Sequence, residues 1–193
     1  MDLRLVTTED AAAVQAIYAP YVESTPASFE LVPPTVVDMA GRIRERRRTH
    51  PWLVAEAAGS VVGYAYGGRF AARPAYDWSV ETTVYVAPAA HRRGAGQALY
   101  TALLRLLAAQ GYRQAMAGVT LPNAASVALH ERLGFVQVAT FAGAGWKFGT
   151  DHDVGWWQRP LTPEGVPRDG SPASPVPVTD LPAEVLASIL GTR

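Results

Sequence analysis

The chain has 193 residues, 49% of them hydrophobic and 18% charged, and these proportions are typical of a single soluble globular domain. Its formal net charge is zero, which argues against a general electrostatic attraction to nucleic acid or to an anionic membrane. It contains no cysteine, which excludes a disulfide framework, a thiol nucleophile and any thiolate metal site.

The first fifty residues predict one strand and two helices. Residues 3–6 have an apolar strand pattern, and a helix start is predicted at Thr7 or Thr8, where two acidic residues follow. Thr35 can cap a second helix, which ends in a basic run over residues 46–48. We interpret this run as solvated, with its positive charges stabilising the negative C-terminal end of the helix dipole. Nucleic-acid binding is the alternative. The apolar stripe of the first helix consists of Val14, Ile17, Tyr18 and Tyr21.

The rest of the chain predicts alternating strands and helices, which describe an α/β domain with a mixed, mostly antiparallel sheet of about six to seven strands flanked by helices. Asn123 is expected to cap one helix, and Gly111 and Gly134 to end two. Beyond residue 160, proline and small polar residues predict a tail, linker-like over residues 162–179, with a short helix over residues 182–190. The predicted strands are residues 52–57, 61–66, 80–86, 115–120, 135–142 and 153–158, the helices 98–110 and 123–133, and the main loop 67–77.

The stretch VYVAPAAHRRGAGQALY, residues 84–100, places bare backbone and positive charge between a strand and a helix. A helix N-terminus offers unpaired N–H groups and the positive end of a dipole, and glycine lets a ligand approach the backbone. Arg92 and Arg93 add charge where a phosphate would lie. The stretch therefore predicts an anion site, with a pyrophosphate as the expected ligand and an ordinary turn as the alternative. It matches neither the Walker loop nor the dinucleotide-binding loop.

A second stretch, LPNAASVALHERLGF over residues 121–135, completes a pattern with the first. Together they resemble the GNAT superfamily of N-acetyltransferases. The segments YDWSVETTVYV, HPWLVAE and HDVGWWQ make the chain similar to the phosphinothricin and methionine sulfoximine acetyltransferase branch of that superfamily. The resemblance spans residues 3–158 and implies a single GNAT domain over residues 1–160, with acetyl-CoA as co-substrate and a homodimer. No spacing of carboxylates and histidines suggests a metal.

The resemblance also implies a set of cofactor-binding residues. Backbone groups of the strand before the loop would bind the pantetheine arm like an added strand, and the loop would hold the pyrophosphate. The alternative for the strand residues is that they only pack in the core. The two roles are compatible, because the backbone can bind the cofactor while the side chains pack in the core. His91 stands where the family usually has glutamine or arginine, and the neighbouring arginines are expected to compensate. The implied residues are Val84, Tyr85, Val86, Arg92, Arg93, Gly94, Ala95, Gly96, Gln97 and Asn123.

Two residues are candidates for proton transfer. Glu81 lies within an otherwise apolar strand, where burial of a carboxylate is costly and would raise its pKa toward the range of a general base. The resemblance assigns the base to this position, and a structural ion pair with an arginine is the alternative. His130 stands where many family members have the tyrosine that protonates the departing thiolate. It is expected to donate that proton or to help position the amine, with a structural or surface role as the alternative.

The resemblance places the substrate residues in two loops. Arg73 and Tyr76 would contact the carboxylate of the substrate, because a guanidinium binds a carboxylate through two hydrogen bonds. Phe29 would form a wall of the same pocket. A solvated loop residue is the alternative for Arg73. Some relatives have a lysine two residues before this arginine, where the present chain has Ala71.

The expected function is transfer of acetyl from acetyl-CoA to the α-amine of a small amino acid or analogue, by direct attack in a ternary complex. Phosphinothricin, methionine sulfoximine and methionine sulfone represent the expected class. The alternatives are a GNAT enzyme acting on a polyamine, an aminoglycoside or a protein N-terminus, and a non-catalytic acyl-CoA-binding module. The N-terminus lacks the apolar core of a signal peptide and no apolar run is long enough to span a membrane. We therefore expect a cytoplasmic enzyme without nucleic-acid or membrane partners.

Overall fold

The computed structural model describes residues 1–162 and 172–191. Within these residues, seven strands form one sheet in the order β1-β2-β3-β4-β5-β7-β6, and all neighbours are antiparallel except β4 and β5, which are parallel. This confirms the predicted α/β class and the mixed, mostly antiparallel sheet. The strands are β1 (Asp2–Leu5), β2 (Trp52–Ala57), β3 (Ser60–Arg69), β4 (Ser79–Val86), β5 (Gln114–Leu121), β6 (Val136–Lys147) and β7 (Thr150–Pro160). The helices are α1 (Ala11–Ser24), α2 (Val36–Arg46), α3 (Ala95–Gln110), α4 (Ala124–Arg132) and α5 (Ala183–Leu190).

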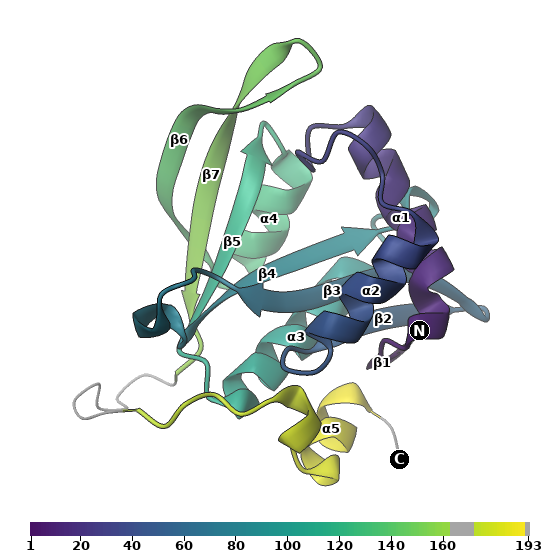
Figure 1. Ribbon diagram of the computed structural model, residues 1–193, viewed down its shortest axis with the longest axis vertical. Coiled ribbons are helices and arrows are strands. Elements are labelled where there is room, and N and C mark those ends of the chain that lie inside the picture. Colours follow the sequence, from purple (N-terminus) through teal and green to yellow (C-terminus); the bar gives the residue numbers. More distant parts are fainter. Residues whose placement is uncertain (163–171, 192–193) are drawn as a thin grey trace.

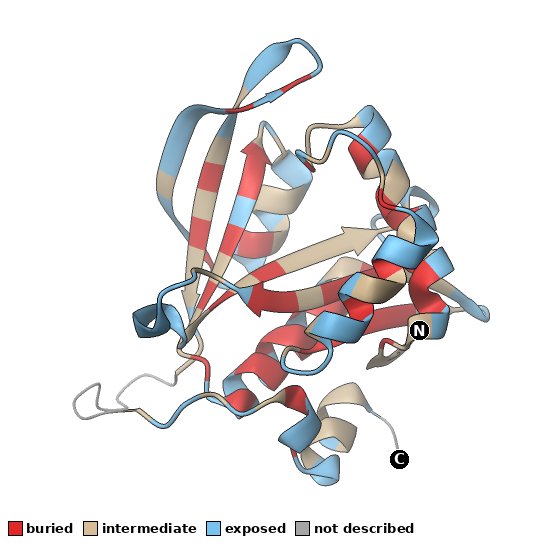
Figure 2. Ribbon diagram, viewed as in Figure 1, coloured by how far each residue is buried: buried red, intermediate tan, exposed pale blue. Residues whose placement is uncertain are grey.

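Helices cover both faces of the sheet (Figure 1). α1 and α2 pack on one face, where Trp52 and Val54 are buried, and α3 packs on the other, where Leu53 and Ala55 are buried. Successive side chains of β2 enter two separate cores, because neighbouring residues of a strand point to opposite faces. Figure 2 shows the buried residues concentrated on the central strands and on α3. In the described ranges, no helix has the length and apolar character needed to cross a membrane.

β4 and β5 separate soon after they begin. Their parallel pairing covers only Ser79–Glu81 of β4, whereas β4 pairs with β3 as far as Val86. Figure 1 shows the two strands diverging beyond this point. In the described part of the chain, one edge of β4 from residue 82 onwards therefore has no strand partner. Apart from the Val86 carbonyl oxygen, which accepts a hydrogen bond from Tyr21, its backbone groups are available to an extended ligand.

Local sequence features begin α2 and α4 and end α3 where expected, whereas α3 begins at Ala95, before the predicted start at residue 98. The Thr35 hydroxyl accepts a hydrogen bond from the Asp38 N–H, and the Asp38 carboxylate accepts one from the Thr35 N–H. The Asn123 side-chain oxygen accepts a hydrogen bond from the Ser126 N–H at 3.1 Å. Gly111 follows α3 with a φ of +97°, a conformation that disfavours any side chain. The predicted starts of α2 and α4 and the end of α3 are confirmed.

The C-terminal hairpin is longer than the sequence predicts. The strand patterns cover residues 135–142 and 153–158, but β6 and β7 continue to Lys147 and Thr150 and remain paired to that point. The pairing register shifts between Phe141 and Gly145, and such an irregularity interrupts the alternation that identifies a strand in a sequence. The predicted loop over residues 67–77 is also shorter, because β3 continues to Arg69 opposite β4.

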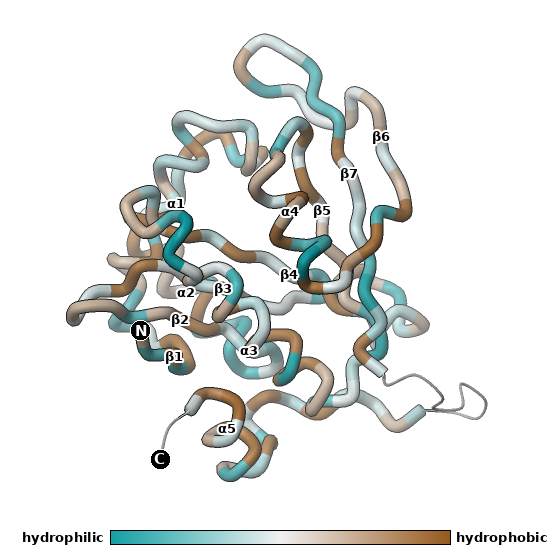
Figure 3. Tube along the Cα trace, turned by 180° about the vertical axis from the view of Figure 1, so that it is seen from behind, coloured by the Kyte–Doolittle hydropathy of each residue, from teal (hydrophilic) through white to brown (hydrophobic). Residues whose placement is uncertain are grey.

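The segment before α5 packs against the domain. Residues 163–171 of the predicted linker lie outside the described residues, and from residue 172 the prediction of a linker is wrong. Val176 donates its N–H to the Gln110 carbonyl oxygen at 2.9 Å, and Gln110 Nε2 donates to the Val176 carbonyl oxygen at 2.6 Å. Val178 and Leu181 are buried in the core beside α3, because their apolar side chains gain free energy by leaving water. α5 coincides with the predicted short helix and lies against α3, as Figure 3 shows from behind.

Candidate active site

Glu81 faces a hollow on the α2 side of the sheet. The hollow has a volume of about 200 Å³ and is lined by Arg46, Tyr66, Gly68, Arg69, Glu81 and Thr83. Burial raises the pKa of the Glu81 carboxyl above its usual range, and the positive charge of Arg46 partly opposes that rise. Within residues 1–162 and 172–191 no ion pair involves Glu81, so the structural ion pair considered from the sequence is not formed there. Such a carboxylate can act as a general base closer to neutral pH than an ordinary one.

Arg46 reaches the hollow from the last turn of α2. Its guanidinium carbon lies 4.3 Å from the centre of the Tyr66 ring and 5.8 Å from that of Trp52, within the range of cation–π contacts. The interpretation of residues 46–48 as a solvated basic run is therefore wrong for Arg46, which is half-buried, although Arg47 and Arg48 are exposed. Sequence reasoning missed this residue, because the rings that it contacts come from β2 and β3.

On the other side of β4, His130 belongs to a buried hydrogen-bond network. Its Nδ1 lies 2.7 Å from the Ser126 carbonyl oxygen and its Nε2 lies 3.0 Å from the Tyr100 hydroxyl. The Tyr100 hydroxyl is 2.7 Å from that of Thr82, which donates to the Met116 carbonyl oxygen at 3.0 Å. All three side chains are buried. Sequence reasoning missed Tyr100 and Thr82, which resemble ordinary core positions of α3 and β4.

Protonation of His130 completes this network. Besides a longer contact of 3.4 Å between the Ser126 hydroxyl and Nδ1, the network has four contacts of 3.0 Å or less. These four each need one hydrogen, and Thr82, Tyr100 and a neutral imidazole supply three. An imidazolium supplies the fourth, from Nε2 to the Tyr100 oxygen, whose own hydrogen then points at Thr82. Burial opposes this state by lowering the pKa of His130, while the bond to the Ser126 carbonyl favours it. The network can therefore hold an additional proton with every hydrogen bond satisfied.

The loop before α3 presents open backbone N–H groups at the helix N-terminus. Gly94 has a φ of +84°, and no side chain among the described residues caps the helix. Arg92 and Arg93 are exposed beside them, and neither forms an ion pair within the described part of the chain. An anion at this place would meet two guanidinium groups and the positive end of the helix dipole. The structure thus brings the predicted loop residues 92–97 together at one helix end.

The loop histidine points elsewhere. His91 Nε2 lies 3.0 Å from the Val86 carbonyl oxygen at the end of β4, and 3.0 Å from the Tyr21 hydroxyl. Tyr21 donates to the same carbonyl oxygen at 2.7 Å. His91 therefore contacts the end of the strand, which leaves the two arginines as the basic side chains of the loop.

Comparisons with known proteins identify the family of the chain. A family model for the acetyltransferase (GNAT) domain matches residues 3–156. The chain belongs to the GNAT acetyltransferases. It is 42% identical over 176 residues to phosphinothricin N-acetyltransferase of Streptomyces viridochromogenes, covering 91% of this chain and 96% of that protein. It is 33% identical over 171 residues to L-methionine sulfoximine/L-methionine sulfone acetyltransferase of Salmonella typhimurium, covering 86% of this chain and 98% of that protein.

Solved structures place this acetyltransferase in the same group. The crystal structure of a GNAT superfamily phosphinothricin acetyltransferase from Sinorhizobium meliloti in complex with AcCoA superposes with a TM-score of 0.84 at 34% identity. The match covers 90% of the present chain and 94% of the other. The family resemblance and the enzyme class predicted from the motifs are confirmed.

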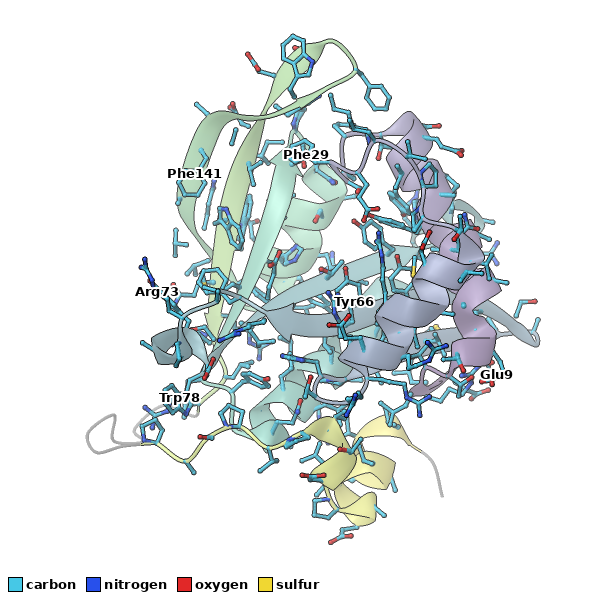
Figure 4. All side chains as sticks on the ribbon, in the orientation of Figure 1. Glu9, Phe29, Tyr66, Arg73, Trp78 and Phe141 are labelled. Carbon is cyan, nitrogen blue, oxygen red and sulfur yellow. The ribbon has the colours of Figure 1, made fainter. Side chains whose placement is uncertain are left out.

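Within a single chain of this acetyltransferase, the predicted substrate residues lie in two separate loops. Arg73 and Tyr76 lie in the exposed loop between β3 and β4, and Phe29 lies in the loop between α1 and α2, near His152 of the hairpin. Figure 4 shows Phe29 and Arg73 in different parts of the molecule. None of the three lines the hollow beside Glu81. Their role in substrate binding stays a prediction.

Proposed function

We propose that this enzyme transfers acetyl from acetyl-CoA to the α-amine of a small amino acid or analogue, of the phosphinothricin, methionine sulfoximine or methionine sulfone class. The observation that supports this most is Glu81, a half-buried carboxyl of raised pKa without an ion pair in the described ranges, at the point where β4 and β5 separate. An amine is protonated at neutral pH and attacks only after it loses a proton, so the reaction needs a base there. The names of the relatives support the substrate class.

Acetyl-CoA supplies the activated acetyl thioester. The open edge of β4 fits the pantetheine arm, which would bind backbone groups of residues 84–86. Residues 92–97, which span the end of the loop and the first turn of α3, fit the pyrophosphate through backbone N–H groups and two guanidinium groups. Asn123 begins α4, the helix that positions His130, and would contact the cofactor as well as cap the helix.

Two side chains of the protein move protons in this scheme. Glu81 accepts a proton from the substrate ammonium group, and the neutral amine attacks the thioester carbonyl carbon within a ternary complex. His130 donates a proton as the thiolate leaves. Both ring nitrogens of His130 contact protein atoms, the Ser126 carbonyl oxygen and the Tyr100 hydroxyl, so the donated proton would pass through the Tyr100 hydroxyl. The absence of cysteine excludes a cysteinyl acyl-enzyme.

We propose that the enzyme is a cytoplasmic homodimer whose interface covers the edge of β6. β6 is the last strand of the sheet, and an apolar edge strand tends to pair with another chain. We propose the cytoplasmic location of the enzyme because its co-substrate, acetyl-CoA, is an intracellular metabolite. The exposed apolar residues of this edge and of the hairpin turn are Val136, Val138, Phe141, Trp146 and Phe148. Light scattering after gel filtration tests the dimer, and a monomer at micromolar concentration would contradict it.

A thiol-release assay with acetyl-CoA tests the proposed function. The acceptor panel contains free amino acids, phosphinothricin, methionine sulfoximine and methionine sulfone, with the matching amides and decarboxylated amines as controls. We expect acetylation of the amino acids at the α-nitrogen, located by mass spectrometry, and poor turnover of the controls. Preference for polyamines, aminoglycosides or peptide N-termini would favour the other enzyme class. Acetyl-CoA binding without turnover of any amine would favour the binding module.

A further inference from the structure

Lys147 is the only lysine of the chain, and it is buried at the end of β6. Its ammonium nitrogen donates to the carbonyl oxygens of Val22 at 2.6 Å, Thr25 at 3.1 Å and Ser28 at 2.6 Å. An ammonium group has three hydrogens, so each has an acceptor. Burial lowers the pKa of Lys147, and the negative charge of Glu30 opposes that shift.

The three carbonyl groups belong to the end of α1 and to the loop that follows it. The last carbonyl groups of a helix have no partner within the helix, and loop carbonyls that are buried need one from elsewhere. Lys147 supplies that partner from a distant strand. Because one side chain binds three points of an irregular segment, it favours one conformation of the loop over residues 25–30.

The same loop contacts the hairpin a second time, through Phe29. A methyl group added at Gly145 of β6 would overlap the Phe29 ring, so the ring lies directly on the hairpin backbone. The ring of His152 in β7 is 6.2 Å from that of Phe29, and Figure 4 shows Phe29 beside the hairpin. Lys147 therefore reaches from the hairpin into the loop, while Phe29 reaches from the loop onto the hairpin.

In the described residues, the end of the hairpin near its turn has no strand neighbour other than its own partner strand. β7 pairs with β5 only from Asp153 onwards, so residues 150–152 and the facing part of β6 pair only with each other. The contacts of Lys147 and Phe29 thus join this end of the hairpin to the α1–α2 loop.

We propose that Lys147 is a positioning residue for the amine substrate: it holds the α1–α2 loop against the hairpin so that Phe29 forms a wall of the acceptor pocket. For the role of Phe29 the proposal rests on the proposed function together with the prediction, from the family resemblance, that Phe29 forms a wall of the substrate pocket. It rests on the contacts above for the connection between loop and hairpin. A methionine at this position would fill similar space without binding the three carbonyl groups, which makes Lys147→Met the informative variant.

The first test uses the fact that the chain has one lysine. The native enzyme is treated with a deuterated acetylating reagent of the sulfosuccinimidyl ester type, and labelling of Lys147 and of the Met1 amine is followed by peptide mass spectrometry. Met1 is exposed, so its amine is the internal reference. We expect Met1 to react while Lys147 stays unlabelled. In Gly145→Ala, displacement of Phe29 should raise the labelling rate of Lys147 about tenfold, because overpacking shifts the local opening equilibrium. Labelling of Lys147 at the rate of Met1 in the parent enzyme would overturn the proposal.

The second test separates positioning from general stability. In Lys147→Met the KM for the amine acceptor should rise about tenfold or more, the effect of losing a hydrogen bond to a charged group, with the KM for acetyl-CoA within about twofold of the parent value. Arg105→Met is the matched control, since it removes an exposed positive charge from α3 and should change neither KM. An equal rise of both KM values, or none, would overturn the proposal.

Two further outcomes are distinguishable. If Lys147→Met does not fold, Gly145→Ala retains the lysine and should show the same split between the two KM values. If no amine in the thiol-release panel is acetylated, the proposed function fails. The labelling experiment then decides by itself whether Lys147 holds the loop to the hairpin.

Discussion

The two sides of β4 differ in character. On the α3 side, Thr82, Tyr100 and His130 are buried, and their polar groups are hydrogen-bonded to one another. On the α2 side, Glu81 faces a hollow with a raised pKa and without an ion pair in the described residues. Adjacent residues of one strand reach these different surroundings because their side chains alternate between faces. On the α3 side the strand therefore contributes to a buried polar network that contains the proposed acid, and on the α2 side it carries the proposed base.

The largest expected effect concerns the hollow. Glu81→Gln removes the base while it preserves shape, and loss of a positioned base typically lowers turnover about 100- to 10,000-fold. The affinity for acetyl-CoA should change little, because the cofactor residues lie further along β4 and in the loop before α3. Steady-state kinetics and calorimetric titration measure the two quantities. A variant with full activity across the pH range would show that Glu81 is structural.

A core substitution on the α3 side of β4 should lower the free energy of unfolding. Leu103 lies on α3 with none of its surface exposed, and Leu103→Ala would leave a cavity in the core. We expect a loss of about 2–5 kcal/mol in the free energy of unfolding, measured by urea denaturation at low temperature. Activity of the molecules that remain folded should be near that of the parent. A similar loss of stability in Glu81→Gln would remove the distinction between the two sides.

Substitutions of Arg73 test whether the loop between β3 and β4 contributes to the substrate site. If Arg73 holds the substrate carboxylate, Arg73→Lys should lower kcat/KM nearly as much as Arg73→Ala, because lysine cannot form the paired hydrogen bonds. The parent enzyme should prefer an acid to its amide about ten- to a hundredfold, since hydrogen bonds to charged groups contribute about 1.5–3 kcal/mol. The amide should lose little more in Arg73→Ala. A parent enzyme that acetylates acids and amides alike would exclude this role.

A smaller effect is expected at the cofactor loop. Arg93→Glu should weaken acetyl-CoA binding about tenfold at low ionic strength by repelling its phosphates, and the loss should shrink as salt screens the charges. Calorimetry at low and high salt measures both values. Unchanged affinity in both conditions would remove Arg93 from the cofactor site.

The regular elements could be predicted from the sequence because their determinants are local. Thr35 and Asn123 begin helices, and Gly111 ends one, through contacts with residues a few positions away. The hairpin was underestimated because its register shifts near Phe141, where the alternation of side chains is interrupted.

The surroundings of the candidate site depend instead on contacts between distant segments. Glu81 could be selected as a buried carboxylate in an apolar strand, but nothing in the sequence indicates that Arg46 leans over Tyr66 beside it. The contact between Tyr100 and His130 likewise joins α3 to α4. Patterns of periodicity identify buried positions, and only the fold shows which polar groups meet there.

The most direct test of the central claim is the pH dependence of kcat/KM in the parent enzyme and in Arg46→Ala. A base works when deprotonated, so activity should fall as the pH falls through the pKa of Glu81, which burial raises above its usual range. Arg46 lowers that pKa, so its removal should move the acidic limb to higher pH, while Arg46→Lys, which keeps the charge, should move it less. In Glu81→Gln this limb should disappear. An acidic limb that stays in place in Arg46→Ala and persists in Glu81→Gln would contradict the assignment of Glu81 as the base.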